Sequence, residues 1–305
     1  MIAAPVSRSA DSGARGFIVV AVLWILAALA ALVLVYLVYV TNTAVVVAVS
    51  TDRVQTEALA TAAVELTAYQ LTSAREDVRP TSGTFDAKIG AHRVSVIFRS
   101  EAARIDLNSA SKELLAGFIS GFGANPSAAE SYADRIIAWR SPATEDDAEN
   151  SFYRTSGLAY VPRHAPFPLV EELWLVSGIP AVFVERMLPF VTVFSNLGTV
   201  NVADAAPQVV AALPGMTPEN LQTVLTQRGD PRVDPQSLLP LAGNGGSLIG
   251  SKAFRVTVGI TLENGRRSGA EVVILLLDEG NEPYRVLSWR NFFDGGTGPQ
   301  KAFLQ

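Results

Sequence analysis

The sequence predicts an α+β protein with one long N-terminal helix, two separated sets of β-strands, and a helical region between the two sets. Three observations predict this fold class. Residues 17–49 form an uncharged apolar run that is much longer than a β-strand. Residues 85–98 and 254–290 contain stretches in which apolar and polar side chains alternate, as they do in half-buried strands. Between these stretches, apolar residues recur at the spacing of a helix.

The N-terminal apolar run is long enough to cross a membrane. A helix of about 20 apolar residues spans a bilayer, whereas the apolar core of a cleavable secretory signal has only about 7–15 residues. Arg8 and Arg15 precede the run, and the cytoplasmic flanks of membrane helices carry the excess of positive charge. We therefore expect a single-pass protein with a cytoplasmic N-terminus, an extracytoplasmic remainder, and Trp24 in the bilayer.

The helical pattern continues beyond this run. Apolar side chains recur at helical spacing at Val54, Ala58, Ala62, Leu66 and Tyr69. We expect one helix from about Phe17 to about Ser73, with its outer half packed on a soluble domain. The pattern leaves open an alternative, in which an ordinary membrane anchor is followed by a separate core helix.

Two stretches of alternating residues predict the strands of an antiparallel sheet. In the first, Gly90-Ala91 forms a turn between two strands that lie between residues 85 and 107. In the second, residues 254–260 alternate, Asn264-Gly265 marks a tight hairpin turn, and residues 272–277 form a fully apolar strand. A last strand contains Val286, Ser288 and Arg290.

The region between the strand sets contains an internal near-repeat. Residues 105–121 align with residues 200–215 as an extended start, a cap, an apolar helix and a glycine. We expect Ser109 and Asp204 to cap these helices, and Pro207 fits a first helical turn, where its missing donor is not needed. Each unit continues into a second helix, over 128–139 and 218–228, and a looser third pair covers 173–188. The pattern predicts an all-helical domain, with Trp139 and Trp174 in its core and Trp289 in that of the sheet.

Paired helices of this kind also occur in DNA-binding helix-hairpin-helix units, in which backbone amides at a Gly-x-Gly turn bind phosphate. A membrane-anchored DNA receptor is therefore an alternative function. However, the turn Pro214–Pro218 lacks the second glycine, and Glu219 puts a negative charge where phosphate would bind. The formal charge of −5 also disfavours a nucleic-acid partner, because phosphate binding needs clustered Lys and Arg.

The sequence shows no catalytic pattern. There is no Cys, which excludes disulfides, thiolate zinc sites and cysteine nucleophiles. His92 lies in a strand pattern and His164 in a loop, and neither has the H-E-x-x-H spacing of a metal site. A glycine-rich phosphate loop with its Lys and a G-x-S-x-G nucleophile turn are also missing. We therefore expect a binding protein rather than an enzyme.

One acidic stretch is a candidate metal site. It consists of Glu145, Asp146, Asp147, Glu149 and Asn150. Carboxylate and amide oxygens are the ligands that calcium prefers, and calcium takes six to eight of them. The alternative is a solvated loop, which is the usual role of a run of charges.

The start of the apolar run resembles the processing site of type IV prepilins, in Arg15-Gly16-Phe17. The resemblance implies that a prepilin peptidase cuts between Gly16 and Phe17 and methylates the new N-terminal Phe17. Most members of that family carry Glu at the fifth mature position, where it pairs with a neighbouring subunit. Here that position is Ala21. Because an unpaired carboxylate is costly in lipid, its absence suits a tip subunit that has no predecessor to pair with.

Three further segments resemble successive signatures of the general secretion pathway protein K family, the large minor pseudopilins of type II secretion. They are Arg104–Leu115, Ala165–Val176 and Val200–Gly215. The resemblance implies a pilin-like fold, in which the long helix packs on an antiparallel sheet and a helical domain is inserted in the sheet. It also implies structural calcium in that domain, although Asn150 stands where an acidic residue is common.

The same resemblance implies the domain boundaries. They are a leader over 1–16, a transmembrane half-helix over 17–49, the outer half-helix and first strands over 50–107, an inserted domain over 108–247, and the last strands over 248–305.

The function implied by the resemblance is that of a minor pseudopilin at the tip of the pseudopilus, where it nucleates or caps assembly for protein export. Its partners would be minor pseudopilins I and J, the prepilin peptidase and the lipid of the bacterial inner membrane, with the bulk of the chain periplasmic. Small residues let membrane helices approach closely, so we expect Ala21, Ala27, Ala30 and Ala31 at the assembly interface. A minor pilin of a type IV pilus is the nearest alternative.

Overall fold

The computed structural model describes residues 13–143, 148–263, 265–280 and 282–293. The chain divides into two compact units, residues 1–58 and residues 59–305. The first unit holds most of helix α1 (Gly13–Ser73), and the second holds the end of α1 and every other helix and strand that the structure describes. Each unit is treated by itself below.

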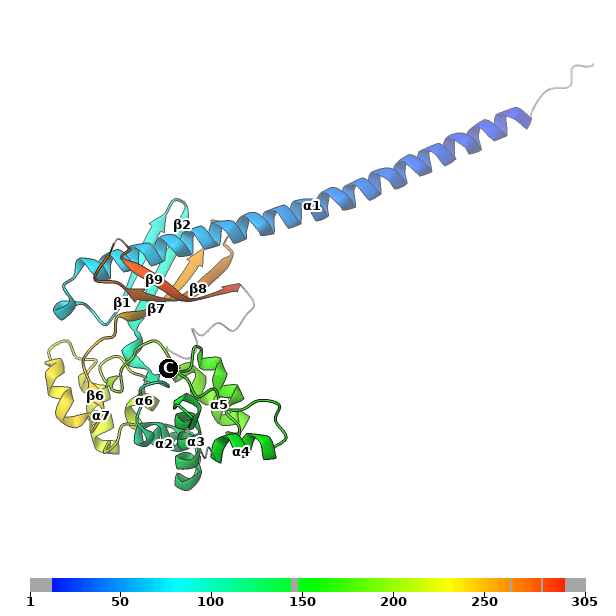
Figure 1. Cartoon of the computed structure of the whole chain (residues 1–305). Coiled ribbons are helices and arrows are strands. Elements are labelled where there is room, and N and C mark those ends of the chain that lie inside the picture. Colours follow the sequence, from blue (N-terminus) through cyan, green and yellow to red (C-terminus); the bar gives the residue numbers. More distant parts are fainter. Residues whose placement is uncertain (1–12, 144–147, 264, 281, 294–305) are drawn as a thin grey trace, which may run out of the picture. The chain divides into compact units, whose positions relative to one another are not determined.

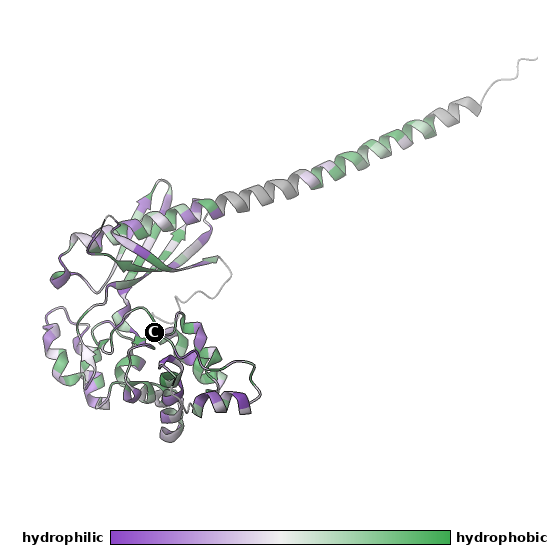
Figure 2. Ribbon diagram, in the orientation of Figure 1, coloured by the Kyte–Doolittle hydropathy of each residue, from purple (hydrophilic) through white to green (hydrophobic). Residues whose placement is uncertain are grey.

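Helix α1 ends at Ser73, as the sequence predicts, and begins at Gly13, four residues before the predicted start. Its segment Val19–Tyr39 has a mean hydropathy of 2.8 over 21 residues and is long and apolar enough to cross a membrane. The apolar stretch stands out in Figure 2. Its large side chains are exposed, Trp24 at 74% and Leu34 at 63% among them. Such a surface suits lipid or other helices better than water.

The second unit contains a five-stranded antiparallel sheet in the order β1-β2-β7-β8-β9 (Figure 1). The strands are β1 (Ser82–Ile89), β2 (His92–Ser100), β7 (Ala253–Thr261), β8 (Arg267–Leu276) and β9 (Tyr284–Phe293). Strand β2 pairs directly with β7, although 152 residues separate their ends (Ser100 and Ala253). The segment between them is therefore an insertion between two neighbouring strands.

One face of the sheet packs on the last turns of α1. The core there contains Leu59, Val64 and Leu71 of the helix, with alternate residues of the central strands, such as Val256 and Val258. Alanines of the helix at 60, 63 and 68 are also buried in this core, and their small side chains let the helix lie close to the strands. The alternation predicted for β2 and β7 is confirmed.

The insertion has its own hydrophobic core, which is distinct from the core under α1. Its longer helices are α2 (Lys112–Gly121), α3 (Pro126–Arg140), α4 (Ala148–Thr155), α5 (Ala181–Met187), α6 (Pro207–Ala211) and α7 (Pro218–Gln227). Short 3-10 helices are η1 (Glu76–Val78), before the sheet, and η2 (Glu101–Ala103), η3 (Val170–Leu175), η4 (Leu188–Phe190) and η5 (Pro235–Leu241) within the insertion.

The insertion is not wholly helical, which corrects the sequence prediction. Strand β3 (Ile105–Asp106) pairs in parallel with β4 (Val191–Thr192), and β5 (Val200–Asn201) pairs in the same way with β6 (Gly246–Ser247). The extended starts of the near-repeat therefore form these two small sheets. Two-residue strands carry no periodicity, so the sequence pattern could not reveal them.

The predicted helix caps were also wrong in part. Ser111, not Ser109, caps α2 by accepting a hydrogen bond from the amide of Leu114 at 3.2 Å. Helix α6 starts after Ala206 and has no side-chain cap, while Asp204 instead accepts a hydrogen bond from Ser82 of β1 at 2.6 Å. Each helix begins two residues later than predicted, because residues 106–110 and 201–205 form a tight turn first.

Trp174 corrects a third prediction, since 48% of it is exposed rather than buried in the core. It lies in η3, a 3-10 helix with about three residues per turn. In this helix Val170 and Leu173 share the inward face, and Trp174 follows on an outward one. Trp139 is 3% exposed, and Trp289 packs against the core of the sheet, as expected.

The internal near-repeat is confirmed in three dimensions, although the turn glycine of the first unit is Gly123 rather than the predicted Gly121, which is the last residue of α2. Gly123 and Gly215 both have a positive φ, of 99° and 83°, and each lies three residues before a proline that opens the second helix of its pair. Asn125 and Thr217 cap these helices through the amides of Ala128 and Asn220. Glycine is needed at both turns, because side chains rarely adopt that backbone conformation.

In each of the two repeat units of the insertion, an arginine at the end of the second helix donates hydrogen bonds back to the tight turn at the start of the unit. At the end of α3, Arg140 donates to the carbonyls of Leu107 and Ala110. After α7, Arg228 donates to the carbonyls of Val202 and Ala205, which lie 95 residues further along the chain than the first pair. Burial lowers the pKa of both guanidinium groups below the ordinary value. The two units thus share a design: a short strand, a tight turn, two helices, and an arginine that returns to the turn.

Candidate functional sites

The apolar segment of α1, Val19–Tyr39, contains the residues expected at the assembly interface. Ala27, Ala30 and Ala31 are exposed, and Ala21 is partly exposed. Gly16 and Phe17 also lie within α1, but their side chains are outside the described part of the chain. The roles predicted for these six residues are taken up below as proposals.

The outer part of α1 also presents an open face. Within residues 59–305, Tyr69 of α1 is 70% exposed and Leu66 is 37% exposed, while Leu71 on the opposite side of the helix is fully buried. On the same part of the helix, Glu65 accepts a hydrogen bond from Tyr284 of β9 at 2.8 Å. Burial and this carboxylate raise the pKa of Tyr284 to about 12, so its hydroxyl stays protonated at neutral pH.

The acidic stretch is only partly described. Glu145, Asp146 and Asp147 lie outside the described residues. Of the remaining two candidate ligands, Glu149 pairs with Arg135 at 3.3 Å, and the Asn150 side-chain oxygen lies 3.2 Å from Nε2 of His164. Among described residues, no group of three or more His, Asp or Glu side chains could hold a metal ion. Glu149 and Asn150 therefore serve to hold α4 in place and do not fit a calcium site by themselves.

The two histidines make local contacts. Nδ1 of His92 accepts a hydrogen bond from the amide of Glu263 at 3.3 Å, in the hairpin turn after β7. Nδ1 of His164 lies 3.1 Å from the carbonyl of Ser141, and its Nε2 contacts Asn150. His164 therefore bridges the two sides of the acidic stretch.

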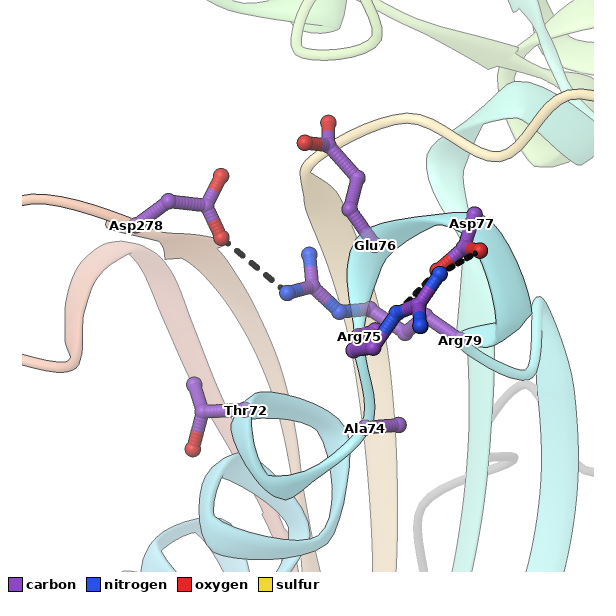
Figure 3. Close-up of a pocket in the computed structure, with 7 residues that line it drawn as sticks. All are labelled: Thr72, Ala74, Arg75, Glu76, Asp77, Arg79 and Asp278. Carbon is purple, nitrogen blue, oxygen red and sulfur yellow. Dashed lines mark hydrogen bonds and ion pairs between the residues drawn. The ribbon is translucent and has the colours of Figure 1, made fainter.

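A pocket of about 660 Å³ lies where α1 ends, between η1 and the end of β8 (Figure 3). Its lining residues are Thr72, Ala74, Arg75, Glu76, Asp77, Arg79 and Asp278. Arg79 donates to the carbonyl of Leu71 at 2.9 Å and to Asp278 at 3.0 Å, and Lys252 pairs with Asp278 at 2.6 Å. Hydrogen bonds from Lys252 and Arg79 lower the pKa of Asp278. These charges neutralise one another and cap the end of α1, so the pocket is part of the scaffold.

A buried charged cluster lies between the sheet and the insertion. Glu101 in η2 is fully buried and accepts two hydrogen bonds from Arg255 of β7, at 2.8 and 3.1 Å, and one from Thr192 of β4. Arg255 also donates to Glu271 of β8 at 2.6 Å. Burial works to raise the pKa of Glu101, but Arg255 and Arg104 outweigh it and hold the pKa below its ordinary value of 4.5.

Sequence analysis did not identify this cluster. Glu101 and Arg255 are 154 positions apart and belong to different segments of the chain. The available signal is that Arg255 lies on the polar face of one predicted strand and that the oppositely charged Glu271 directly precedes another. That pattern is usual on an exposed face and does not reveal burial.

Neither hairpin turn in the described residues combines a Gly-x-Gly pattern with clustered basic residues: the turn before α7 lacks the second glycine, and no basic cluster follows Gly121-Phe122-Gly123. In both units the side chains of Asn125 and Thr217 already cap first-turn amides of the second helix, at 2.8 and 3.2 Å. A bound phosphate would need such amides uncapped. Glu219 also lies in the first turn of α7. The geometry gives this alternative no support.

Comparison with known proteins identifies the relatives of this chain. Residues 99–196 match the sequence profile of the family described as type II secretion system protein K. The fold resembles that of a chain in the crystal structure of the GspK–GspI–GspJ complex from the type 2 secretion system of enterotoxigenic Escherichia coli, with a TM-score of 0.55 and 17% identity. The match covers 80% of this chain and 98% of that chain. No curated protein matches the sequence.

Proposed function

We propose that the chain is a member of the protein K family of type II secretion and that it is the minor pseudopilin at the tip of a pseudopilus, where it nucleates or caps assembly. The observation that carries this proposal is the family match over residues 99–196, which lies in a chain of pilin-like fold with one apolar N-terminal helix. A bulky insertion between two neighbouring strands fits a terminal position, because it enlarges the head without interrupting the core beneath α1.

The proposed partners are minor pseudopilins I and J. The solved relative is described as a complex of GspK, GspI and GspJ, which supports equivalent partners here. The contact surface proposed on this chain is α1, through Ala21, Ala27, Ala30 and Ala31 in its apolar segment. Small side chains allow helices to pack closely in a membrane, where burying apolar area against another helix gives little advantage over lipid.

Processing between Gly16 and Phe17 is part of the same proposal. In cells of a bacterium with a prepilin peptidase, mass spectrometry of the purified chain should find methylated Phe17 as the first residue. A Gly16→Val variant should remain uncut, and a Gly13→Val variant three residues upstream should be cut normally. An intact Met1 in the unmodified chain would rule out pseudopilin processing.

Assembly can be tested by co-purification from a membrane fraction. We expect pseudopilins I and J to copurify with this chain, and Ala27→Leu combined with Ala31→Leu to weaken that association. Recovery of type IV pilus subunits instead would assign the chain to a pilus. When the gene is deleted, loss of pseudopili indicates nucleation, whereas longer pseudopili indicate capping.

Calcium binding by the acidic stretch, which consists of Glu145, Asp146, Asp147, Glu149 and Asn150, remains a separate proposal. Its support is the chemistry of three consecutive carboxylates, since calcium prefers oxygen ligands. We expect calcium to raise the thermal midpoint of the full chain in detergent. Asp146→Asn with Asp147→Asn should abolish that rise, while Asp86→Asn on β1 should leave it unchanged. The absence of any rise in the unmodified chain would exclude a calcium site.

A further inference from the structure

The sheet and the insertion meet through polar groups rather than through a shared apolar core. Most buried apolar residues fall into two separate clusters, one under α1 and one in the insertion, and the few that belong to neither are Ala102, Ala103, Ala253 and Val273. The two crossing segments of the chain are joined where Ser100 meets Ser251, with their hydroxyl oxygens 3.1 Å apart and the amide of Ser251 donating to Ser100 at 2.8 Å. Because apolar contacts are not directional, they do not by themselves fix one orientation between the sheet and the insertion. That orientation therefore depends on directional hydrogen bonds and ion pairs.

Glu101 is the buried charged group that bonds to both parts, beside the hydrogen bond from Ser82 of β1 to Asp204 of the insertion. It lies in η2, which contacts both β7 of the sheet and β5 of the insertion. The two carboxylate oxygens of Glu101 each accept one hydrogen bond from the guanidinium of Arg255 in the sheet. Oε2 also accepts a hydrogen bond from the hydroxyl of Thr192 in the insertion. A two-pronged guanidinium–carboxylate pair fixes orientation as well as distance.

The groups around Glu101 complete the cluster. Arg255 is held on its other side by Glu271, which is 8% exposed. The Nε atom of Arg104 lies 3.8 Å from Glu101, and the same guanidinium donates to the carbonyl of Pro189 in the insertion. Each charge in the cluster therefore has an opposite charge beside it, which buried charges require.

A second ion pair spans the same boundary but is exposed. Arg290 of β9 pairs with Glu171 of η3, and the two side chains are 54% and 46% exposed. Exposed pairs of this kind contribute little, because water screens the charges and both side chains must be ordered. The structure thus provides one buried and one exposed pair across a single boundary.

We propose that Glu101 is a positioning residue that fixes the orientation of the inserted domain on the pilin-like sheet, through its simultaneous bonds to Arg255 and Thr192. The two separate cores fold without it, and Glu101 selects one of the orientations that the polar boundary would otherwise permit. The proposal holds whether or not the chain caps a pseudopilus. If it does cap one, the orientation of the head would be fixed relative to the end of α1.

The test uses the complete lack of cysteine in the chain. Spin labels are attached at Lys88→Cys on β1 and Gln222→Cys on α7, both at exposed positions, in the full chain in detergent. With Glu101 present, pulsed electron resonance should give one narrow distribution of label-to-label distance. In Glu101→Gln the distribution should broaden and gain further distances, while amide hydrogen exchange within α2, α3, β7 and β8 stays slow.

The matched control is Glu171→Gln, the same change at the exposed pair, which should leave the distance distribution unchanged. Thr192→Val serves as a milder second variant, because it keeps the Glu101–Arg255 pair and removes the bond from Thr192 to Glu101, together with the bond that Thr192 accepts from the amide of Phe194, and it should broaden the distribution less. A narrow, unshifted distribution in folded Glu101→Gln would overturn the proposal. General loss of exchange protection in both Glu101→Gln and Thr192→Val would also overturn it, since the cluster would then be needed for folding rather than for orientation.

Discussion

The two related units of the insertion share one local structure but differ in the length of the segment that follows the second helix. Both have a short strand, a tight turn, a glycine turn with positive φ, a capped second helix and a closing arginine. In the second unit, 18 residues separate the end of α7 at Gln227 from β6 at Gly246. In the first, 50 residues separate the end of α3 at Arg140 from β4 at Val191. The added segment holds the acidic stretch and η3, so the first unit carries the candidate ligand site and the exposed Trp174.

The units differ most informatively at their first strands. Asp106 and Asn201 occupy equivalent positions, are each 1% exposed, and accept the amide two residues ahead. Asp106 also accepts bonds from the hydroxyl of Ser195 and the amide of Asn196, so all its partners are donors. Asn201 donates instead to the carbonyl of Leu248 at 3.1 Å. The surrounding backbone thus explains a carboxylate in one unit and an amide in the other.

The largest expected difference in stability between the two units concerns Arg140 and Arg228, the arginines that bond back to the tight turns. Arg140 uses two separate nitrogens for its two carbonyls, whereas Arg228 shares one nitrogen between its carbonyls, at 3.3 and 2.5 Å. A buried carbonyl left unpaired costs roughly 1–3 kcal/mol, so we expect Arg140→Ala to destabilise its unit by about 2–4 kcal/mol and Arg228→Ala by about 1–2 kcal/mol. Amide hydrogen exchange, measured separately over α2–α3 and α6–α7, gives the loss of stability in each unit.

Arg140→Lys keeps the charge but loses the two-pronged geometry. The stability of the first unit in this variant should lie between that of the unmodified chain and that of Arg140→Ala. Equal losses in the two units on changing either arginine would show that the units unfold together. The comparison between them would then have no energetic meaning.

The next effect comes from exchanging the two first-strand side chains. Asp106→Asn presents an amide to donors, and Asn201→Asp presents a carboxylate to the carbonyl of Leu248, so each change leaves a buried polar mismatch. We expect each to cost about 1–3 kcal/mol, as is usual for a buried group without its partner. Exchange rates of the amides of Leu107 and Val202, which bond to β4 and β6, report the loss.

Asp134→Asn in α3 is the control for this exchange, because its side chain is 57% exposed and pairs only with Lys112 among the contacts described. It should change the stability of the first unit by about 0–1 kcal/mol. A neutral Asp106→Asn would show that side-chain chemistry at this position is interchangeable between the units.

The smallest expected effect concerns the helix caps. Removing a cap costs about 1 kcal/mol, so Asn125→Ala and Thr217→Ala should each loosen only the first turn of α3 and α7. The shorter bond of Asn125, 2.8 Å against 3.2 Å, predicts the larger of the two losses. Asn125→Ser should retain most of the stability, since serine also caps. Exchange that rises beyond the first turn in either variant would contradict this local role.

Much of the fold could be predicted from the sequence, because its signals are local. Period-two alternation identified β2 and β7, and proline at the first position identified α7, whereas α3 was predicted to begin at residue 128 and begins at Pro126. The cap of α2 was misplaced because Ser109 and Ser111 are the same residue type, and that of α6 because the helix begins after Ala206 without a side-chain cap. For the candidate ligand site, the sequence supplied the acidic residues but not the contacts of Glu149 with Arg135 and of Asn150 with His164.

By itself, the sequence determined the apolar segment of α1, the strands and the repeated helical units, because burial and backbone preference act on neighbouring residues and leave periodic patterns. Only the tertiary structure decided that Glu101, Arg255 and Thr192 meet between the sheet and the insertion. Their contact depends on chain segments that are distant in sequence. A charged residue looks the same in sequence whether it faces water or a buried partner, and only the packing around it distinguishes the two.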